Sequence, residues 1–420
     1  MTVVGLDDTD SREGMCSTYV AARIARRLRR EARVERLLLV RLNPAVEHKT
    51  RGNAALAVHT DADPETALAV AREAVDDGAE GDANPGVVVA PGDPSAVPAD
   101  VSSFYRRAVR DFHDVADARA LAADRGYRTA EWGVGRGLVG ALAAVGAWAA
   151  GEDWTRERIA YRERERWGTP RTVDADEVFA AADAAYPDAW DTVDRGEGET
   201  VCVPHTPCPL LCGVRGDDPD AVRDVADAVG RAASEPVAFA ETFLTNQGTD
   251  AHLREGSVGD LRDGRAYRVT GEVAAAPETR RGGHVFVTLA DGDATVECAA
   301  FEPTKRFRDR VRALRPADRI TACGEVSRGT LKLEKFAVRD LETTERVTPT
   351  CPDCGRTMES AGAGQGYRCR DCGATAAGRA TRTVERDLER GWYEVPPCAR
   401  RHVAKPLVRG GFDAPVHPER

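Results

Sequence analysis

The sequence predicts a multidomain protein of mixed α/β class whose C-terminal half holds a small β-barrel and a metal-binding segment. Strand and helix patterns alternate through roughly the first 250 residues, as is typical of α/β domains. Five short strand patterns with one helix after the third come next, followed by two Cys-x2-Cys pairs. A chain of 420 residues is too long for one hydrophobic core, so several domains are expected.

The first stretch, residues 1–125, opens on the apolar strand Met1–Leu6. A helix follows, because Val20, Ile24 and Leu28 recur at four-residue spacing with arginines on the other face. The further elements expected here are strands over Leu37–Leu42 and Ala54–His59 around the polar loop Glu47–Asn53, a helix over Pro64–Asp77, and a strand over Val87–Val89 after Asn84-Pro85-Gly86.

The second stretch, residues 126–255, begins with a turn of small residues, Gly133–Gly137, ahead of an apolar helix. The composition marks no clear break near residue 125. The further elements expected here are a strand over Thr200–Val203, a loop over His205–Gly213, a helix over Asp220–Ala233 and a strand over Ala238–Leu244.

A β-rich stretch occupies residues 256–345. Its one helix pattern, Thr304–Leu314, falls between the third and fourth strands, which is the element order of an OB-fold, a barrel that commonly binds nucleic acid. The five expected strands are Tyr267–Ala275, His284–Ala290, Thr295–Phe301, Arg319–Val326 and Thr330–Val338.

Two cysteine pairs within residues 346–376 predict a zinc ribbon. Cys351 and Cys354 are followed, after fourteen residues, by Cys369 and Cys372, and each pair can supply two thiolates to a tetrahedral zinc ion. Four cysteines close the coordination sphere, so the zinc should be structural; four unrelated buried thiols are the alternative. Cys202, Cys208 and Cys212 fit no common metal spacing, and packed or free thiols explain them better.

The net charge is −10, which is unusual for a protein that binds nucleic acid. Only five of the 59 basic residues are lysine and acidic residues are abundant, a composition suited to a salty cytoplasm. Residues 346–420 carry 13 basic against 9 acidic residues, so the segment 377–420 is expected to contact RNA. No apolar run approaches the roughly 20 residues of a membrane span, and no secretory signal is visible. We expect a cytoplasmic protein, monomeric and without a membrane partner.

An acidic cluster, Asp7, Asp8 and Asp10, follows the first strand. Crowded carboxylates repel one another unless a cation compensates, and Mg²⁺ with bound phosphates is the usual compensator. Ser17 and Thr18 lie near the start of the next helix, where free amides favour phosphate. The alternative is a solvated cap for that helix.

Further polar residues could hold phosphate. Lys49, Arg51 and Asn53 occupy the loop between two expected strands, and Arg136 and Gly137 belong to the glycine turn, although small residues also permit simple close packing. The chain contains no Walker sequence. A polar segment, Thr245–His252, follows an expected strand and could be a binding loop or a plain connection.

Several motifs together carry a resemblance to a known family. They are Gly5-Leu6-Asp7-Asp8-Thr9-Asp10-Ser11, Gly14-Met15-Cys16-Ser17-Thr18-Tyr19, Arg41-Leu42-Asn43-Pro44, Lys49-Thr50-Arg51-Gly52-Asn53, Asn84-Pro85-Gly86, Gly135–Leu142, Thr206-Pro207-Cys208-Pro209, Thr245-Asn246 with Thr249-Asp250, Ala300–Lys305, Glu394–Pro397, and Arg400-Arg401-His402 with Lys405-Pro406-Leu407. In this order, from residue 1 to about 410, they resemble the archaeal tRNA 2-agmatinylcytidine synthetases.

The resemblance implies a kinase-like domain, a ferredoxin-like domain, an OB-fold and a zinc ribbon. It implies an enzyme that uses ATP and Mg²⁺ to join agmatine to C2 of the wobble cytidine of the isoleucine tRNA with a CAU anticodon. The cytidine C2 oxygen is first phosphorylated, and the amine of agmatine displaces the phosphate. The modified base then pairs with adenosine.

The same resemblance implies roles for residues. The acidic cluster would hold Mg²⁺, and the self-phosphorylated position falls on Ser17, with Thr18 beside it. Agmatine is cationic at both ends, so Asp250 with Asn246 and Thr249 is the choice for its pocket. The residues expected to bind tRNA are Lys305, Arg306, Arg400, Arg401, His402 and Lys405.

Two other classes of function remain open. A non-catalytic single-strand binder would explain the OB-fold and the ribbon, but it would leave the acidic cluster unused. A small-molecule kinase or ligase would use the α/β part and require no tRNA.

Overall fold

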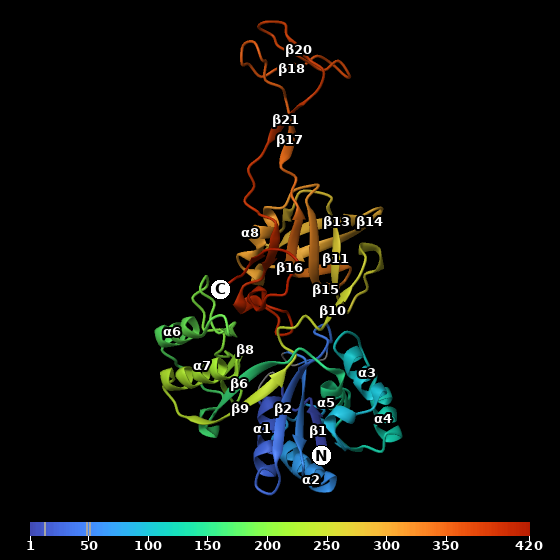
Figure 1. Cartoon of the computed structure of the whole chain (residues 1–420), viewed down its shortest axis with the longest axis vertical. Coiled ribbons are helices and arrows are strands. Elements are labelled where there is room, and N and C mark those ends of the chain that lie inside the picture. The colour runs from blue at the N-terminus through green and yellow to red at the C-terminus, as the bar shows by residue number, and fades with distance from the viewer. Residues whose placement is uncertain (12–13, 48, 50–51) are drawn as a thin grey trace.

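The computed structural model describes residues 1–11, 14–47, 49 and 52–420. The α/β half lies at one end of an elongated molecule, the barrel in the middle and the cysteine-rich segment at the far end (Figure 1). The expected fold class is confirmed: the α/β half is followed by a five-stranded barrel and a four-cysteine ribbon. Within the described part of the chain, no helix has the length and apolar character needed to cross a membrane.

One nine-stranded sheet runs through the whole α/β half in the order β5-β4-β1-β3-β2-β9-β6-β8-β7. Its two parts are joined where β2 pairs in parallel with β9, at Leu38 with Leu244 and Leu39 with Thr245. The strands are β1 Thr2–Asp7, β2 Val34–Arg41, β3 Ala54–Thr60, β4 Gly86–Pro91, β5 Arg128–Glu131, β6 Thr155–Arg162, β7 Ala189–Trp190, β8 Leu210–Gly216 and β9 Val237–Thr245.

Helices cover both faces of this sheet. The helices are α1 Ser17–Leu28, α2 Pro64–Asp76, α3 Ala99–Ala108, α4 Val115–Asp124, α5 Leu138–Ala150, α6 Ala175–Ala185 and α7 Pro219–Ala232. Alternation along the strands decides the layers: Val4 and Leu6 of β1 pack with α1 and α2, while Val3 packs with α3, α4 and α5. The glycine at position 5 lets α5 approach β1, since a Cβ there would lie 2.1 Å from the Ala141 carbonyl oxygen.

Most of the expected elements are present, and two expectations are wrong. Residues Thr200–Val203 form a turn and not the expected strand. Their apolar side chains are buried because Cys202 and Val203 pack into a hydrophobic core, which produces the same apolar pattern as a strand. The expected loop His205–Gly213 contains the start of β8, which begins at Leu210 after a proline. The sequence interpretation also omitted β5, β6, α3, α4 and α6.

The domain boundary near residue 125 stays a prediction. In the structure β5 pairs with β4, and α5 packs against α3, β1 and β4. Residues of the second expected stretch therefore complete the sheet and the core of the first.

The barrel is closed by five strands. β11 pairs with β13 and β15, β14 joins β13 to β16, and β15 pairs with β16, with α8 (Phe307–Arg312) after the third strand as an OB-fold requires. The strands are β11 Arg265–Val273, β13 Val285–Asp291, β14 Ala294–Ala300, β15 Arg319–Ser327 and β16 Thr330–Asp340, with the short β10 Leu253–Glu255 and β12 Glu278–Thr279 at the periphery.

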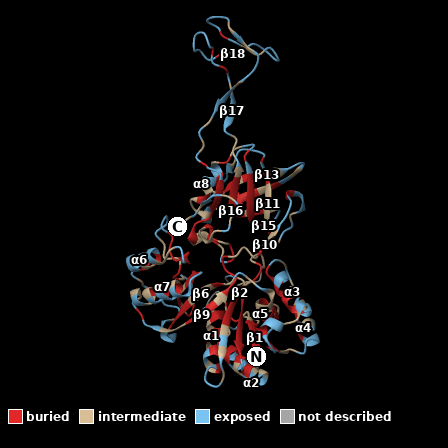
Figure 2. Cartoon of the chain, viewed as in Figure 1, coloured by how far each residue is buried: buried red, intermediate tan, exposed pale blue. Residues whose placement is uncertain are grey.

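The cysteine-rich segment projects from the barrel on a two-stranded arm, β17 (Thr344–Val347) paired with β21 (Ala380–Thr383). Its own strands are β18 Glu359–Ser360, β19 Tyr367–Arg368 and β20 Thr375–Ala376. Most of it is exposed, in contrast to the buried interiors of the sheet and the barrel (Figure 2).

The chain returns from the arm to the body of the molecule. β22 (Gly391–Glu394) pairs with β16, and β23 (Val416–His417) pairs with β22. The last 30 residues thus extend the barrel sheet and lie between the barrel and the α/β half (Figure 1).

Candidate active site

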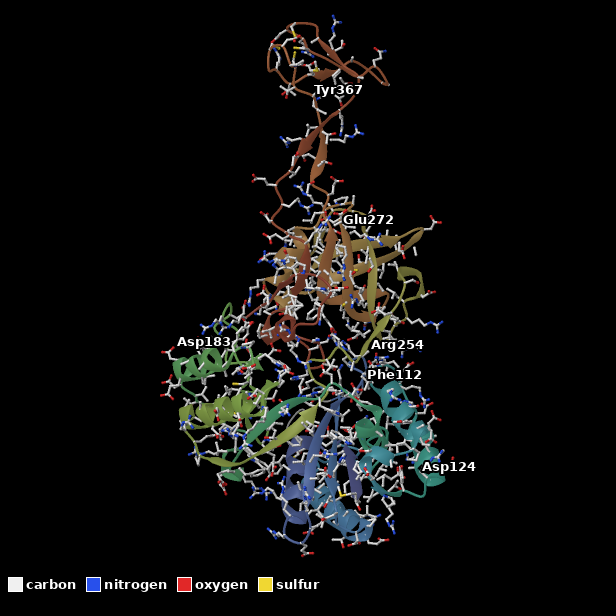
Figure 3. The ribbon with its side chains drawn as sticks, in the orientation of Figure 1. Phe112, Asp124, Asp183, Arg254, Glu272 and Tyr367 are labelled. Atoms are coloured by element: carbon white, nitrogen blue, oxygen red, sulfur yellow. The ribbon has the colours of Figure 1, made fainter. Side chains whose placement is uncertain are left out.

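A cavity of about 280 Å³ opens at the carboxyl end of β1. The acidic cluster forms one wall, and the loop after β2, the end of α3 with the residues after it, and the start of α5 form the others. The polar and aromatic side chains that line it are Asp7, Asp8, Asp10, Lys49, Asn53, Asp111, Phe112, His113, Asp114 and Arg136. Figure 3 shows Phe112 near the junction between the α/β half and the barrel.

The three carboxylates of the cluster line this cavity together. Asp8 adopts a left-handed backbone (φ 59°), and its amide donates to Asp7 Oδ1 at 2.6 Å. The Arg136 Nε lies 3.0 Å from Asp8 Oδ2. Burial, and then the charge of Asp8, raise the pKa of the Asp7 carboxyl well above its usual range. A divalent cation with oxygen preference would relieve this repulsion, so the cluster fits Mg²⁺.

Some of the other predicted phosphate ligands line the cavity, and some do not. Lys49 and Arg136 line the cavity, and burial followed by the charge of Arg401 lowers the pKa of Lys49. Asn53 lines it too, although its amide donates to the Asn43 carbonyl at 3.0 Å. Gly137 serves close packing, since a Cβ there would lie 2.4 Å from the Gly86 nitrogen. Arg51 lies outside the described residues.

A second cavity of about 200 Å³ adjoins the first, and Asp10, Gly52 and Ala54 line both. Ser17 and Thr18, the first residues of α1, lie in its wall. The backbone amide and the hydroxyl of Thr9 approach the Ser17 hydroxyl oxygen at 3.4 and 3.0 Å. The cavity is also lined by charged residues from three strands, Arg41, Glu157 and Arg215, and by His402 from the tail.

The residues predicted to bind agmatine are not among the described residues that line either cavity. Asn246 is fully buried, and its side chain bonds the Arg41 amide at 2.7 Å and the Arg41 carbonyl at 2.9 Å. The Asp250 carboxylate accepts two bonds of 2.8 Å from Lys335 Nζ, and Thr249 donates to the Asn246 carbonyl at 2.7 Å. This loop therefore ties the α/β half to the barrel.

The residues predicted to bind tRNA are largely engaged within the protein. Arg306 lies 2.9 Å from Asp194, and Lys305 lies 3.5 Å from Glu197. Arg400 is buried and pairs with Asp191 and, at 2.8 Å, with Glu394. Arg306 and Arg400 are thus ion-paired with residues far away in the chain, and their contact with tRNA stays a prediction.

The remaining predicted tRNA-binding residues of the tail contact the barrel or line the second cavity. Arg401 pairs with Glu334 at 3.0 Å and with Glu325, both on barrel strands. The backbone carbonyl of Lys405 accepts a hydrogen bond of 2.6 Å from the Nζ of Lys335. His402 reaches the second cavity, where the charge of Arg41, followed by burial, lowers the pKa of its imidazole well below the usual value. The tail thus connects the barrel to the second cavity.

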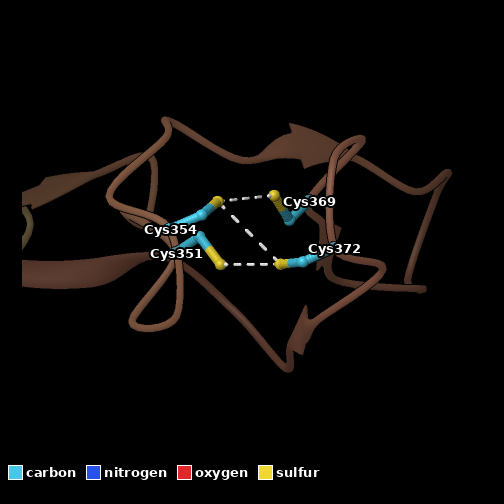
Figure 4. Close-up of side chains that lie close together, drawn as sticks. All are labelled: Cys351, Cys354, Cys369 and Cys372. Atoms are coloured by element: carbon cyan, nitrogen blue, oxygen red, sulfur yellow. Dashed lines mark hydrogen bonds between the residues drawn. The ribbon is translucent and has the colours of Figure 1, made fainter.

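The four predicted zinc ligands come together at the far end of the molecule (Figure 4). Their sulfur atoms all lie within 4.8 Å of one another, with separations of 3.3 Å for Cys351 and Cys372, and 3.4 Å for Cys354 and Cys369. Ligands at about 2.3 Å from a tetrahedral zinc ion are about 3.8 Å apart, so this cluster fits zinc. The amides of Cys372 and Asp371 lower the pKa of the Cys369 thiol to about 7, whereas hydrogen bonds from the neighbouring sulfurs raise the pKa of Cys354 and Cys372.

Sequence reasoning missed much of the second cavity. Arg41 is within a quoted motif, but no role was assigned to it, and Glu157 and Arg215 lie on strands far along the chain. Single charged residues in strands give no signal of their own, because nothing local distinguishes them from solvated residues. Asp111, Phe112 and His113 of the first cavity were also missed, because they lie in the segment after α3 and nothing local distinguishes them from solvated loop residues.

Comparison with protein-family models gives four matches along the chain. They are described as a TiaS TCKD domain over residues 3–63, a TiaS FLD domain over residues 135–252, an OB-fold nucleic acid binding domain over residues 260–337, and a TiaS C-terminal zinc ribbon domain over residues 348–388. The order of these matches is the order of the parts described above.

Two curated relatives extend the similarity over complete chains. The tRNA 2-agmatinylcytidine synthetase TiaS of Haloquadratum walsbyi, an enzyme named for an isoleucine tRNA, is 52 % identical, and that of Methanosarcina acetivorans is 44 % identical, each over 100 % of both chains. A solved complex of TiaS with this isoleucine tRNA and ATP is 38 % identical and superposes with a TM-score of 0.89 over 100 % of this chain and 99 % of that one. A complex with the same tRNA, AMPCPP and agmatine gives 36 % and 0.87 over the same shares.

Proposed function

Since the chain belongs to the tRNA 2-agmatinylcytidine synthetase (TiaS) family, we propose that it uses ATP to join agmatine to C2 of the wobble cytidine in the CAU-anticodon isoleucine tRNA. The observation that carries the proposal is the cavity at the end of β1, where the carboxylates of the acidic cluster lie together with Arg136 and Lys49. Solved relatives that match the whole chain hold the isoleucine tRNA, ATP or its analogue, and agmatine. The single-strand binder considered as an alternative leaves this cavity without a purpose.

The reaction needs an activated base because the C2 carbonyl of cytosine is urea-like and a poor electrophile. Transfer of the ATP γ-phosphoryl group to the C2 oxygen releases ADP and turns that oxygen into a leaving group. The primary amine of agmatine then forms a bond to C2, the C2–O bond breaks, and phosphate departs with the former carbonyl oxygen. The amine loses a proton in this step, and a new C–N bond joins agmatine to the base. An enzyme that forms such a bond at the expense of ATP is a ligase.

The acidic cluster is the proposed centre of phosphoryl transfer. Asp7, Asp8 and Asp10 would hold Mg²⁺, which screens the phosphate charges and orients the γ-phosphoryl group. Arg136, which pairs with Asp8, and Lys49, which lines the same cavity, would present positive charge to the phosphates. Ser17, with Thr18 beside it, is the proposed site of self-phosphorylation.

Recognition of the tRNA is assigned to the barrel and the zinc ribbon. The ribbon stands on its arm at the end of the molecule opposite the α/β half (Figure 1), so it can bind RNA remote from the reacting base. The wobble base must leave its stack to reach a cavity at the end of β1, at a cost of a few kcal/mol.

The test combines purified protein, Mg²⁺, ATP, agmatine and unmodified CAU-anticodon isoleucine tRNA at high potassium chloride. The tRNA is digested, and its nucleosides are identified by mass spectrometry. Agmatine-adducted cytidine should form only in the complete mixture and not with the Asp8→Asn variant. Protein that is folded and zinc-loaded, turns over ATP and yet forms no adduct would contradict the proposed substrate.

A further inference from the structure

Phe112 is an aromatic residue that the fold leaves in contact with solvent. It lies in the segment after α3 and is 51 % exposed. Among the described residues it is the only phenylalanine or tryptophan that is exposed, since the others are buried or half-buried. A single exposed apolar side chain is ordinary at a protein surface, so its position and its neighbours must show whether it has a function.

The ring lies where the catalytic cavity meets the barrel. Phe112 lines the first cavity, and it also lines a groove of about 730 Å³ whose other walls come from the loop after β2, from Phe301, and from β15 and β16 with the turn between them. A Cβ at Gly264 would lie 2.5 Å from Phe112 Cε2, so the ring packs on the backbone just before β11. Phe112 is therefore a wall residue of both the cavity and the groove.

The residues on both sides of Phe112 are held in place. The Asp111 carboxylate accepts a hydrogen bond of 3.0 Å from Arg265. The His113 ring stacks on Phe104 with the ring centroids 3.8 Å apart, and its Nε2 donates to the Phe104 carbonyl at 3.2 Å. Because the backbone is fixed on both sides, the exposed ring is presented in a defined place, and little conformational entropy is lost when a partner binds it.

The groove also contains an arginine that can contact phosphate. Arg328, in the turn between β15 and β16, is exposed, and none of the ion pairs within the described part of the chain includes its guanidinium. Two carboxylates of the groove are engaged elsewhere: Asp263 accepts a bond of 2.9 Å from the Arg328 amide, and Glu325 pairs with Arg401. The third, Glu47, is exposed. An aromatic ring that stacks on a base, beside a cation that contacts the backbone, is how proteins bind single-stranded nucleic acid.

We propose that the ring of Phe112 stacks on the adenine that follows the wobble cytidine in the CAU anticodon, with Arg328 beside the phosphate backbone. This inference rests on the proposed function, in which the wobble cytidine leaves its stack to enter the first cavity. The adenine then loses a stacking partner on that side. Phe112 lies in the wall of the cavity that the cytidine enters, so its ring can replace the missing partner.

Phe112 is on this account a positioning residue, because it holds the anticodon open without touching the reacting atoms. Loss of the ring should therefore raise the KM for tRNA more than it lowers kcat. The KM for ATP should stay unchanged, since the phosphates bind at the acidic cluster.

The first test compares Phe112→Leu with Phe112→Trp in the full-length protein. Loss of a stacking ring weakens binding about tenfold, so Phe112→Leu should raise the tRNA dissociation constant in filter binding, and the KM for tRNA in the agmatinylation assay, by about this factor. Phe112→Trp keeps an aromatic face and should stay within about twofold of the wild type. Phe179→Leu is the matched control, because this ring packs on α6 and lines neither the cavities nor the groove.

An abasic tRNA identifies the stacked base. The anticodon adenosine is replaced by an abasic nucleotide, and binding to the wild type and to Phe112→Leu is compared. If the ring stacks on this adenine, the two proteins should bind the abasic tRNA equally, because the two changes remove one shared interaction. A tenfold difference that persists with the abasic tRNA overturns the assignment, since the ring would then contact another base.

Arg328→Gln tests the phosphate contact. It should make the slope of log affinity against log salt shallower by about 0.7, the value of one phosphate contact to a single strand. An unchanged slope removes Arg328 from the site.

Two other outcomes overturn the inference for Phe112. One is equal tRNA affinity in Phe112→Leu and the wild type. The other is a raised KM for ATP with unchanged tRNA affinity, which would assign the ring to the adenine of ATP. Agmatinylation by the wild type is measured in parallel. No adduct with the wild type contradicts the proposed function, whereas adduct formation with an unaffected Phe112→Leu contradicts this inference alone.

Discussion

A single methyl group on α5 should inactivate the enzyme without unfolding it. A Cβ at position 140 would lie 1.9 Å from Asp7 Oδ2 and 2.6 Å from its Cγ, whereas ordinary contact begins at 3.4 Å. In Gly140→Ala the carboxylate must therefore move by about 1.5 Å. Displacements of about 1 Å at a catalytic centre can cost about 100-fold in rate, so we expect ATP turnover to fall at least that far.

The stability of the same variant should change little. The colliding Oδ2 and Cγ belong to a side chain that can rotate, and the Asp7 Cβ, 2.8 Å from the new Cβ, needs a shift of only a few tenths of an ångström. Alanine also gains up to about 1 kcal/mol over glycine inside a helix. The matched control is Gly146→Ala on the same helix, where the new Cβ would lie 2.3 Å from the Val101 carbonyl oxygen. That backbone cannot rotate away, so the control should lose about 1–3 kcal/mol of stability while the acidic cluster stays in place.

The assay is ATP turnover in the presence of tRNA, paired with urea unfolding of both variants. The reasoning predicts opposite outcomes: Gly140→Ala stable and inactive, Gly146→Ala less stable and active below its unfolding transition. Gly140→Ala with turnover within twofold of the wild type would refute it, because either Asp7 is not needed or α5 does not approach it.

Three further predictions use other parts of the molecule. Asp8→Asn should lower ATP turnover at least about 100-fold, because loss of the metal affects the chemical step more than tRNA binding. The tRNA dissociation constant, measured by filter binding, should stay within about twofold of the wild type. An equal loss of ATP turnover and of tRNA affinity would mean that the acidic cluster is structural. A short turn that joins residue 347 to residue 380, where β17 and β21 pair, removes the ribbon and keeps the tail. This deletion should weaken tRNA binding and leave basal ATP hydrolysis unchanged. Unchanged tRNA affinity would exclude the ribbon from the tRNA interface. Burial lowers the pKa of His59 to about 3, below the ordinary 6.5. Between these two pH values the unfolded state binds one more proton than the folded state, so the free energy of unfolding falls as the pH drops, by up to about 5 kcal/mol at pH 3. Urea unfolding at pH 7 and pH 4 should show this fall in the wild type and a smaller one in His59→Leu.

The path of the tail makes an internal deletion of the ribbon the sharper experiment. Truncation after residue 345 would also remove β22, the strand that pairs with β16, and the buried ion pairs of Arg400. Such a protein would lose part of the barrel sheet together with the ribbon, so loss of tRNA binding would have two explanations. The internal deletion separates them.

Features that depend on neighbours in the chain could be predicted from the sequence alone. Cys-x2-Cys pairs place two thiolates on one tight turn, and five strand patterns with a helix after the third already specify much of a barrel. The acidic cluster Asp7–Asp10 could be identified because three carboxylates stand together after a strand. In each case the chemistry and the spacing are local, so they can be recognised before the chain folds.

Which distant charges meet depends on the tertiary fold. Arg306 and Arg400 resemble RNA contacts in the sequence, but the fold pairs them with Asp194 and Asp191. The sequence suggests Asp250 as a contact for a cationic ligand, but in the folded protein its carboxylate pairs with Lys335. Arg41 and Arg215 lie 174 positions apart and line one cavity only because β2, β9, β6 and β8 are neighbours in one sheet. A charged side chain shows its sign in the sequence, but its partner is fixed by strand order and register, which depend on the packing of the whole chain.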